Sequence, residues 1–132
     1  KLIRERGITL EYETKTVMIS VNPELFSRLL VNLVSNAYRY GRENGHIRVR
    51  LWQEDSSLVL SVADDGIGIA RNEQEKIFRR FYQADASRGG EGTGLGLAMV
   101  YEIARFYHGT VTVESVVDQG STFVVRMPAG QS

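Results

Sequence analysis

A glycine-rich stretch that runs into an apolar helical pattern is the feature that most constrains this chain. Residues 90–97 read Gly-Glu-Gly-Thr-Gly-Leu-Gly-Leu, and apolar residues then recur at helical spacing to about residue 107. Glycine inside a helix costs about 1 kcal/mol relative to alanine, so Gly94 and Gly96 are poor choices for stability alone. The free N–H groups of a helix's first turn favour an anion. The stretch therefore predicts either a polyphosphate cradle or a tight turn before an ordinary helix, and alone it does not separate the two.

The length and composition of the chain exclude several classes of function. A chain of 132 residues fits one domain with a real core, and we expect a monomer. The 16 basic and 16 acidic residues balance, so no net charge favours nucleic acid or an anionic membrane. Cysteine is absent, which excludes disulfides and thiolate metal sites. Without a membrane-span or signal-peptide pattern, we expect a cytoplasmic domain with no direct membrane contact. Its first residue is lysine, which suggests a piece of a longer protein.

The order of predicted elements indicates the fold class. Alternating apolar and polar residues predict strands over 8–13, 17–20, 46–54, 58–63, 110–116 and 121–127, with turns at 55–57 and 118–120. Asn22 and Pro23 open a long helix that Gly41 ends, and further helices are expected over 72–78 and from the glycine stretch to about residue 107. This order predicts one α+β domain over residues 1–132. It would be a two-layer sandwich whose helices cover one face of a mixed, mostly antiparallel sheet of five or six strands.

The long helix carries a polar row beside its apolar stripe. The stripe consists of Phe26, Leu30, Leu33, Val34 and Ala37, and the polar row of Asn32, Asn36, Arg39 and Tyr40. Because the row flanks the stripe, we expect it to face the edge of a cleft. Amide oxygens and a hydroxyl suit Mg²⁺ in company with phosphates and water, and Arg39 adds a cation. On its own, an ordinary solvated face is the simpler interpretation.

A second candidate site follows a predicted strand, at Asp64-Asp65-Gly66-Ile67-Gly68-Ile69. The glycines would let the backbone approach a flat ligand. An ionised Asp64 would select adenine, which offers its exocyclic amine as a donor where guanine presents an acceptor oxygen. A plain Asp-Gly turn remains open as an alternative. A calcium loop fits less well, because the carboxylate repeat and closing glutamate of that motif are missing.

A loop without periodicity precedes the glycine stretch. Residues 81–92 are small, polar and glycine-rich, which predicts a mobile, functional loop. The aromatic residues of Phe78-Arg79-Arg80-Phe81-Tyr82 would anchor its base, and Arg79, Arg80 or Arg88 would reach a phosphate when it closes. The end of an amphipathic helix explains the same residues nearly as well. His46 and His108 have no partner at metal-ligand spacing, so we expect both to be structural.

Taken in order, these motifs resemble the catalytic ATP-binding domain of bacterial sensor histidine kinases. That family belongs to a superfamily shared with gyrase, heat-shock chaperones and mismatch-repair ATPases. The asparagine box is similar to residues 32–41, the first glycine box to 64–69, the phenylalanine box to 78–82 and the second glycine box to 92–97. A small C-terminal glycine motif matches residues 120–123. The resemblance covers nearly the whole chain and implies the Bergerat-type ATP-binding fold.

The resemblance also implies residue roles. Asn36 would bind Mg²⁺, with Asn32 near the metal and phosphates and Arg39 on a phosphate; these three would be the catalytic residues. Asp64 would hold the adenine amine, with Tyr40 near the base. Residues 81–91 would form the ATP lid. The other ATP contacts implied are Gly66, Gly68, Ile69, Arg80, Phe81, Arg88, Gly92, Thr93, Gly94, Leu95, Gly96, Leu97 and Thr122.

The implied reaction is transfer of the γ-phosphoryl group of ATP to a histidine on a separate phosphoacceptor and dimerisation domain. A response regulator receiver domain would be the second partner. The parent protein could be an inner-membrane sensor, but the sequence leaves open whether it spans a membrane. Neither His46 nor His108 sits in a helix beside an acidic residue, as a phosphoacceptor of this family would. The chain alone is therefore expected to bind Mg²⁺–ATP without phosphorylating itself, and to bind no nucleic acid.

Two positions bear on which subclass of this superfamily the chain resembles. The hydrolysing relatives and the serine-directed kinases of the superfamily carry glutamate where this chain has Asn32, which cannot act as a general base. This difference favours a histidine kinase over an ATPase, a protein serine kinase or a non-catalytic nucleotide-binding interaction module. Gln83 departs from the family pattern, because many members have arginine after the Phe-Tyr pair. The cation at the γ-phosphate would then be Arg80 or Arg88.

Overall fold

The computed structural model describes residues 7–14, 21–78 and 96–128. Within this part of the chain, five strands form one sheet with the order β1-β2-β3-β5-β4. The strands are β1 (Thr9–Thr14), β2 (His46–Glu54), β3 (Ser57–Asp64), β4 (Thr110–Val116) and β5 (Gly120–Pro128). Strand β1 runs parallel to β2, and the other neighbouring pairs are antiparallel. The sheet is therefore mixed and mostly antiparallel, as predicted.

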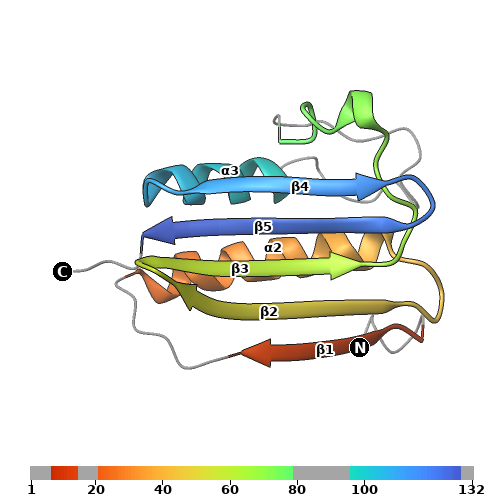
Figure 1. Cartoon of the computed structure of the whole chain (residues 1–132), viewed down its shortest axis with the longest axis horizontal. Helices are drawn as coiled ribbons and strands as arrows, with labels where there is room; N and C mark the ends of the chain where they lie inside the picture. The colour runs from red at the N-terminus through yellow and green to blue at the C-terminus, as the bar shows by residue number, and fades with distance from the viewer. Residues whose placement is uncertain (1–6, 15–20, 79–95, 129–132) are drawn as a thin grey trace.

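Two α-helices cover one face of this sheet. Helices α2 (Pro23–Tyr40) and α3 (Gly96–Phe106) both lie behind the strands in Figure 1. They pack against each other and against the strands, which confirms the predicted two-layer α+β fold. No helix of the described residues is long and apolar enough to cross a membrane.

The hydrophobic core lies between the helices and the sheet. Strand alternation supplies its sheet side, since cross-strand neighbours such as Val49, Val62 and Phe123 all point to the same face. Leu29 and Leu33 of α2 are fully buried against them. Phe78 joins this core, with its ring centroid 6.1 Å from that of Phe123. Phe78, the first residue of the phenylalanine motif, is therefore packed against the core, and anchoring of the following loop by this motif stays a prediction.

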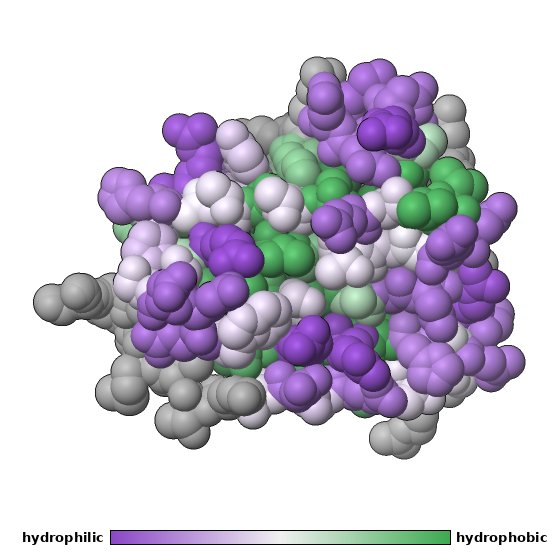
Figure 2. Space-filling model, in the orientation of Figure 1, coloured by the Kyte–Doolittle hydropathy of each residue, from purple (hydrophilic) through white to green (hydrophobic). Residues whose placement is uncertain are grey.

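The other face of the sheet carries charged pairs. Arg48 lies 3.4 Å from Glu11 on the neighbouring strand, and Arg50 lies 3.3 Å from Glu13. Figure 2 shows hydrophilic side chains spread over this face, with apolar ones visible between them. Exposed ion pairs of this kind contribute little to stability, so this face gives the sheet a polar exterior.

The limits of the helices follow local signals. The side chain of Asn22 caps α2 by accepting hydrogen bonds from the N–H groups of Glu24 (2.8 Å) and Leu25 (3.1 Å), and Pro23 occupies the first turn. Gly41 ends this helix as predicted. Helix α3 ends at Phe106, and His108, two residues later, has a φ of 62° that turns the backbone into the left-handed region. The N–H of Gly109 then donates to the carbonyl of Ala104 at 2.7 Å.

Three predictions about elements need correction, and two lie outside the described residues. Residues 72–78 do not form a regular helix: a 3₁₀ turn covers Arg71–Glu73, and turns follow to residue 78. Both predicted turns are shorter than expected, because Ser57 already belongs to β3 and Gly120 to β5. The apolar pattern of the helix after the glycine stretch includes Phe106, but this residue is 68% exposed, and the buried side of α3 consists of Ala98, Val100, Ile103 and Ala104. The predicted strand at 17–20 and loop at 81–92 fall outside the described residues.

Candidate functional site

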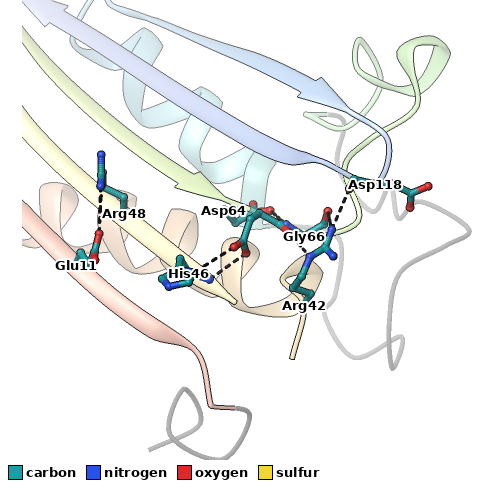
Figure 3. Close-up of polar contacts among 8 residues, drawn as sticks. Glu11, Arg42, His46, Arg48, Asp64, Gly66 and Asp118 are labelled. Atoms are coloured by element: carbon teal, nitrogen blue, oxygen red, sulfur yellow. Dashed lines mark hydrogen bonds and ion pairs between the residues drawn. The ribbon is translucent and has the colours of Figure 1, made fainter. Parts of the chain in front are cut away.

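The end of α2, the end of β3 and the β4–β5 turn meet around residues 64–69. The N–H of Ile67 donates to the carbonyl of Tyr40 at 3.0 Å, and the N–H of Asp118 donates to the carbonyl of Ile67 at 2.8 Å. Figure 3 shows Asp64, Gly66, Arg42 and Asp118 gathered at this junction. Backbone bonds to two separate parts of the chain therefore fix the segment.

Asp64 is a partly buried carboxyl group at the end of β3. Its Oδ1 accepts a hydrogen bond from the N–H of Gly66 at 2.8 Å, and the backbone of Ser121 on β5 also donates to it. Burial raises the pKa of Asp64 to about 6, although these backbone hydrogen bonds lower it. Most of the group is then ionised at neutral pH. A carboxylate accepts up to about four hydrogen bonds, so it retains capacity for a donor on a ligand.

The two glycines of this segment serve internal packing. A Cβ on Gly66 would lie 2.0 Å from the carbonyl oxygen of Tyr40. Gly68 has a φ of 75°, and a Cβ there would lie 2.3 Å from the carbonyl oxygen of Val116. Both positions therefore exclude a side chain because protein backbone occupies the space. This reason differs from the ligand approach expected from the sequence, and contact of either glycine with a nucleotide stays a prediction.

The polar row of α2 lies partly buried beside the start of α3. Asn32 donates through Nδ2 to the carbonyl of Arg28 at 2.8 Å and lies 3.6 Å from the sulfur of Met99. A Cβ on Gly96 would lie 3.3 Å from Asn32 Oδ1. The structure thus brings the asparagine row and the described end of the second glycine motif together, as the clustering of these motifs predicts.

Asn36 is the candidate metal ligand. It is only 8% exposed and lies among the buried residues of α2. An amide oxygen in such a position fits a hard cation that also carries phosphates and water. Arg39 and Tyr40 follow it on the last turn of α2 and are both partly exposed. Their placement is compatible with ligand contacts, which remain predictions.

The remaining predicted contacts differ in their placement. Ile69 is buried in the core, and its N–H donates to Ser115 Oγ at 2.7 Å. Leu97 also packs against the core. Arg80, Phe81, Arg88, Gly92, Thr93, Gly94 and Leu95 lie outside the described residues.

Thr122 lies on the opposite face of the sheet from Asp64. It pairs with Ala63 of β3 and Glu114 of β4, so strand alternation directs its side chain to the face away from the helices. Ser121 is the neighbour that shares the helix-covered face with Asp64, because these two residues are cross-strand partners. The sequence motif does not show which residue of this adjacent pair shares a face with Asp64, and contact of Thr122 with a nucleotide stays a prediction.

Ser115 and Gln74 are site residues that sequence reasoning missed. Ser115 Oγ lies 2.7 Å from the N–H of Ile69, 2.8 Å from Ser121 Oγ and 3.0 Å from the carbonyl of Gly120. Gln74 donates through Nε2 to the carbonyls of Ile69 (2.9 Å) and Ser115 (3.2 Å). Ser115 could have been found, because it is a polar residue at a core-facing position of a strand that otherwise presents valines there.

His46 pairs with Asp65 beside the site. Its backbone N–H donates to Asp65 Oδ1 at 2.9 Å, and its Nδ1 lies 3.2 Å from Asp65 Oδ2. Burial raises the pKa of the Asp65 carboxyl, but the hydrogen bonds from His46 outweigh it and leave this pKa below its ordinary value. His46 therefore has the structural role predicted for it.

Comparison with known proteins identifies the family. Residues 21–131 match the family described as histidine kinase-, DNA gyrase B-, and HSP90-like ATPase. The chain belongs to this ATPase family. The match confirms the resemblance inferred from the five motifs.

Curated relatives within the ATPase family include sensor histidine kinases. The chain is 36% identical over 92% of its length to the circadian input-output histidine kinase CikA of Synechococcus elongatus. It is 40% identical over 81% of its length to the sensor histidine kinase RppB of Synechocystis. It spans only 16% of CikA and 24% of RppB, so each relative is several times longer than this chain.

Solved structures of histidine kinases share the fold. The mycobacterial sensor histidine kinase MprB superposes with a TM-score of 0.87 at 26% identity, covering 99% of this chain and 90% of that one. Full-length ShkA in complex with AMPPNP has a TM-score of 0.86 at 28% identity, over 99% of this chain and 27% of that one. ThkA in complex with the response regulator TrrA has a TM-score of 0.77 at 25% identity, over 97% and 36%.

Proposed function

We propose that this chain binds Mg²⁺–ATP and transfers the γ-phosphoryl group to a histidine on a dimerisation domain, as part of a two-component system. The observation that carries the proposal is the ionisable Asp64, fixed at the junction of α2, β3 and the β4–β5 turn, in a member of this ATPase family. The named histidine kinase relatives support the reaction class. The AMPPNP complex of ShkA supports an adenine nucleotide as the ligand.

The candidate site residues that the structure describes have separate roles in this proposed function. Asp64 accepts a hydrogen bond from the adenine amine, and Tyr40 lies beside the base. Asn36 would hold the magnesium ion, with Asn32 near the metal and phosphates, and Arg39 would contact a phosphate. A bound magnesium ion neutralises charge on the phosphates during transfer. The main contribution of the protein is then to position the nucleotide and balance its charge.

Asn32 supports transfer to histidine rather than hydrolysis. A neutral imidazole is already nucleophilic, so its nitrogen can bond to the γ-phosphorus while the bond to the departing oxygen of ADP breaks. This step needs no general base, whereas activation of water or a serine hydroxyl benefits from one. The amide of Asn32 cannot take up that proton, and within the described residues it already donates to the carbonyl of Arg28.

The partners follow from the same proposal. We infer that the chain works beside a phosphoacceptor and dimerisation domain and that a response regulator receiver domain takes the phosphoryl group. The complex of ThkA with TrrA supports the second partner. We place the domain in the cytoplasm and expect it to be a monomer when isolated.

Calorimetry with ATP and Mg²⁺ tests the proposal. The unmodified chain should bind ATP, while Asp64→Asn and Asn36→Ala should each weaken binding at least about tenfold, because each removes a polar contact to the ligand. Labelled ATP should not modify the chain alone but should label a dimerisation domain supplied with it. Strong ATP hydrolysis by the unmodified chain would instead favour an ATPase. Absence of ATP binding would favour an interaction module without catalysis.

A further inference from the structure

Arg42 bridges two parts of the candidate site, although no motif in the sequence includes it. It follows Gly41 directly after the end of α2, and its side chain extends toward residues 64–69. Its Nε donates to the carbonyl of Asp65, and its Nη2 donates to the carbonyl of Asp118 at 2.9 Å, with the carbonyl of Gly66 at 3.4 Å. One guanidinium group therefore connects the segment after β3 with the β4–β5 turn.

The carbonyls that Arg42 holds belong to the residues that orient Asp64. Asp65 and Gly66 follow Asp64 directly, and the N–H of Gly66 is the donor that fixes Asp64 Oδ1 at 2.8 Å. Displacement of the Asp65 and Gly66 peptides would move this donor and with it the carboxylate. The planar fork of arginine is well suited to this task, because it presents several N–H donors in fixed directions.

We propose that Arg42 is a positioning residue that holds the Asp64 carboxylate in place for adenine. This inference rests on the proposed binding of ATP. Arg42 acts through backbone carbonyls, so it need not touch the nucleotide.

The geometry distinguishes this role from a simple ion pair. Figure 3 shows the carboxylate of Asp118 pointing away from Arg42, whose contact is with the carbonyl of that residue. The carboxylate of Asp65 is engaged by His46 instead. The proposal therefore requires the hydrogen-bond donors of Arg42 and not the negative charge of either aspartate.

The test measures selectivity between ATP and inosine triphosphate in the 132-residue chain. Inosine carries an oxygen in place of the adenine amine, so the affinity ratio of the two nucleotides reports how well Asp64 is placed. Arg42→Met removes the donors and keeps most of the aliphatic stem. In Arg42→Met we expect ATP affinity to fall about tenfold and most of the preference for ATP to be lost, because the substitution removes hydrogen bonds that a charged group donates. Arg42→Lys should retain part of the preference, since one ammonium reaches fewer of the carbonyls.

Two controls make the result specific. Arg48→Met also removes a partly exposed arginine, but that residue pairs with Glu11 on the far face of the sheet, so the ATP preference should not change. Asp118→Asn keeps the carbonyl and removes the charge, and it should behave like the unmodified chain. If Asp118→Asn reproduced the loss seen with Arg42→Met, an ion pair would explain the data and the proposal would be overturned.

Thermal unfolding separates positioning from general stability. A lower melting temperature in Arg42→Met with an unchanged ATP preference would overturn the proposal. If Arg42→Met does not fold, Arg42→Lys decides, and a preference equal to that of the unmodified chain would overturn it equally. Absence of ATP binding in the unmodified chain would refute the proposed function itself, a different result from normal binding that does not depend on Arg42.

Discussion

At the scale of single residues, the carboxyl group of Asp64 is held where burial opposes its ionisation while two backbone donors favour it. The balance leaves its pKa at about 6, above its ordinary value of 3.8. The unfolded chain therefore loses this proton at lower pH than the folded chain does. The contribution of the Asp64 carboxyl to the free energy of unfolding is fully present below about pH 4 and is lost as the pH rises through about 6. An ionised Asp64 thus costs stability at neutral pH, which is compatible with the role in nucleotide binding proposed for it.

Replacement of Asp64 by asparagine should stabilise the ligand-free chain at pH 7. The amide can still accept from the N–H of Gly66, and the cost of a buried charge disappears. A pKa shift from 3.8 to about 6 sets an upper limit of about 3 kcal/mol on the gain. Urea unfolding should show the gain above pH 6, a decline toward pH 4 and none below that. Asp55→Asn in the exposed β2–β3 turn is the control, and an equal gain there would contradict the explanation.

ATP selectivity should depend on the ionisation of Asp64. As pH falls from 7 to 5, the carboxylate gains a proton and loses part of its ability to accept from the adenine amine. The ratio of ATP to inosine triphosphate affinity should therefore decrease with a midpoint near pH 6. The ratio cancels the titration of the phosphates, which both nucleotides share. Calorimetry across this pH range measures the ratio, and a constant value would show that Asp64 does not accept a hydrogen bond from the adenine amine.

At the scale of elements, the segment that follows β3 is fixed from both sides. The end of α2 contributes the carbonyl of Tyr40, and β4 contributes the hydroxyl of Ser115. The site therefore depends on the relative placement of two elements that are about seventy residues apart in sequence. On the β4 side, Ser115 makes this connection, because its hydroxyl contacts Ile69, Gly120 and Ser121.

Removal of the Ser115 hydroxyl should loosen this segment. In Ser115→Ala the partly buried N–H of Ile69 loses its acceptor, which typically costs about 1–3 kcal/mol. Denaturant unfolding should show this loss, and ATP affinity should fall with it. Thr112→Ala on the exposed face of the same strand is the matched control, with a change within about 0.5 kcal/mol. Equal effects of the two substitutions would mean that the hydroxyl network is not what stabilises the segment.

Elements with local signals could be predicted from sequence, and those set by distant contacts could not. Asn22 and Pro23 mark the start of α2 and Gly41 its end, and the structure agrees. The apolar pattern at 72–78 suggested a helix, but so short a helix is marginal without tertiary support. There, the side chain of Gln74 bonds to the carbonyls of Ile69 and Ser115 instead. A helix-capping pattern is local, whereas that contact exists only in the folded chain.

The same distinction applies to the site. Asp64 stood out because a carboxylate followed by two glycines at a strand end is a recognisable pattern. Arg42 could not be found this way, because its acceptors are backbone carbonyls 23 and 76 residues away, which no residue type marks. The motif also could not show that Ser121, and not Thr122, shares a face with Asp64, because strand register decides which side chain faces the helices.

At the scale of the whole molecule, the sheet places the candidate site at one end and leaves β1 outside it. Strand β1 lies at the sheet edge and pairs only with β2 within the described residues, as Figure 1 shows. Strands β3 and β5 are central and carry Asp64 and Ser121, which are cross-strand partners. A ligand at the site should therefore strengthen the central strands, the end of α2 and the β4–β5 turn, with little effect on the edge.

Hydrogen exchange with and without ATP tests this distribution. The amides of Gly66, Ile67, Ile69 and Asp118 all donate within the junction, so bound ATP should slow their exchange together. Amides of β1 should change little, because an edge strand exchanges through local opening that the ligand does not oppose. Inosine triphosphate at the same concentration should protect the junction less, since it cannot donate to Asp64. Equal protection of β1 and the junction would indicate general stabilisation and would contradict a site built where α2, β3 and the β4–β5 turn meet.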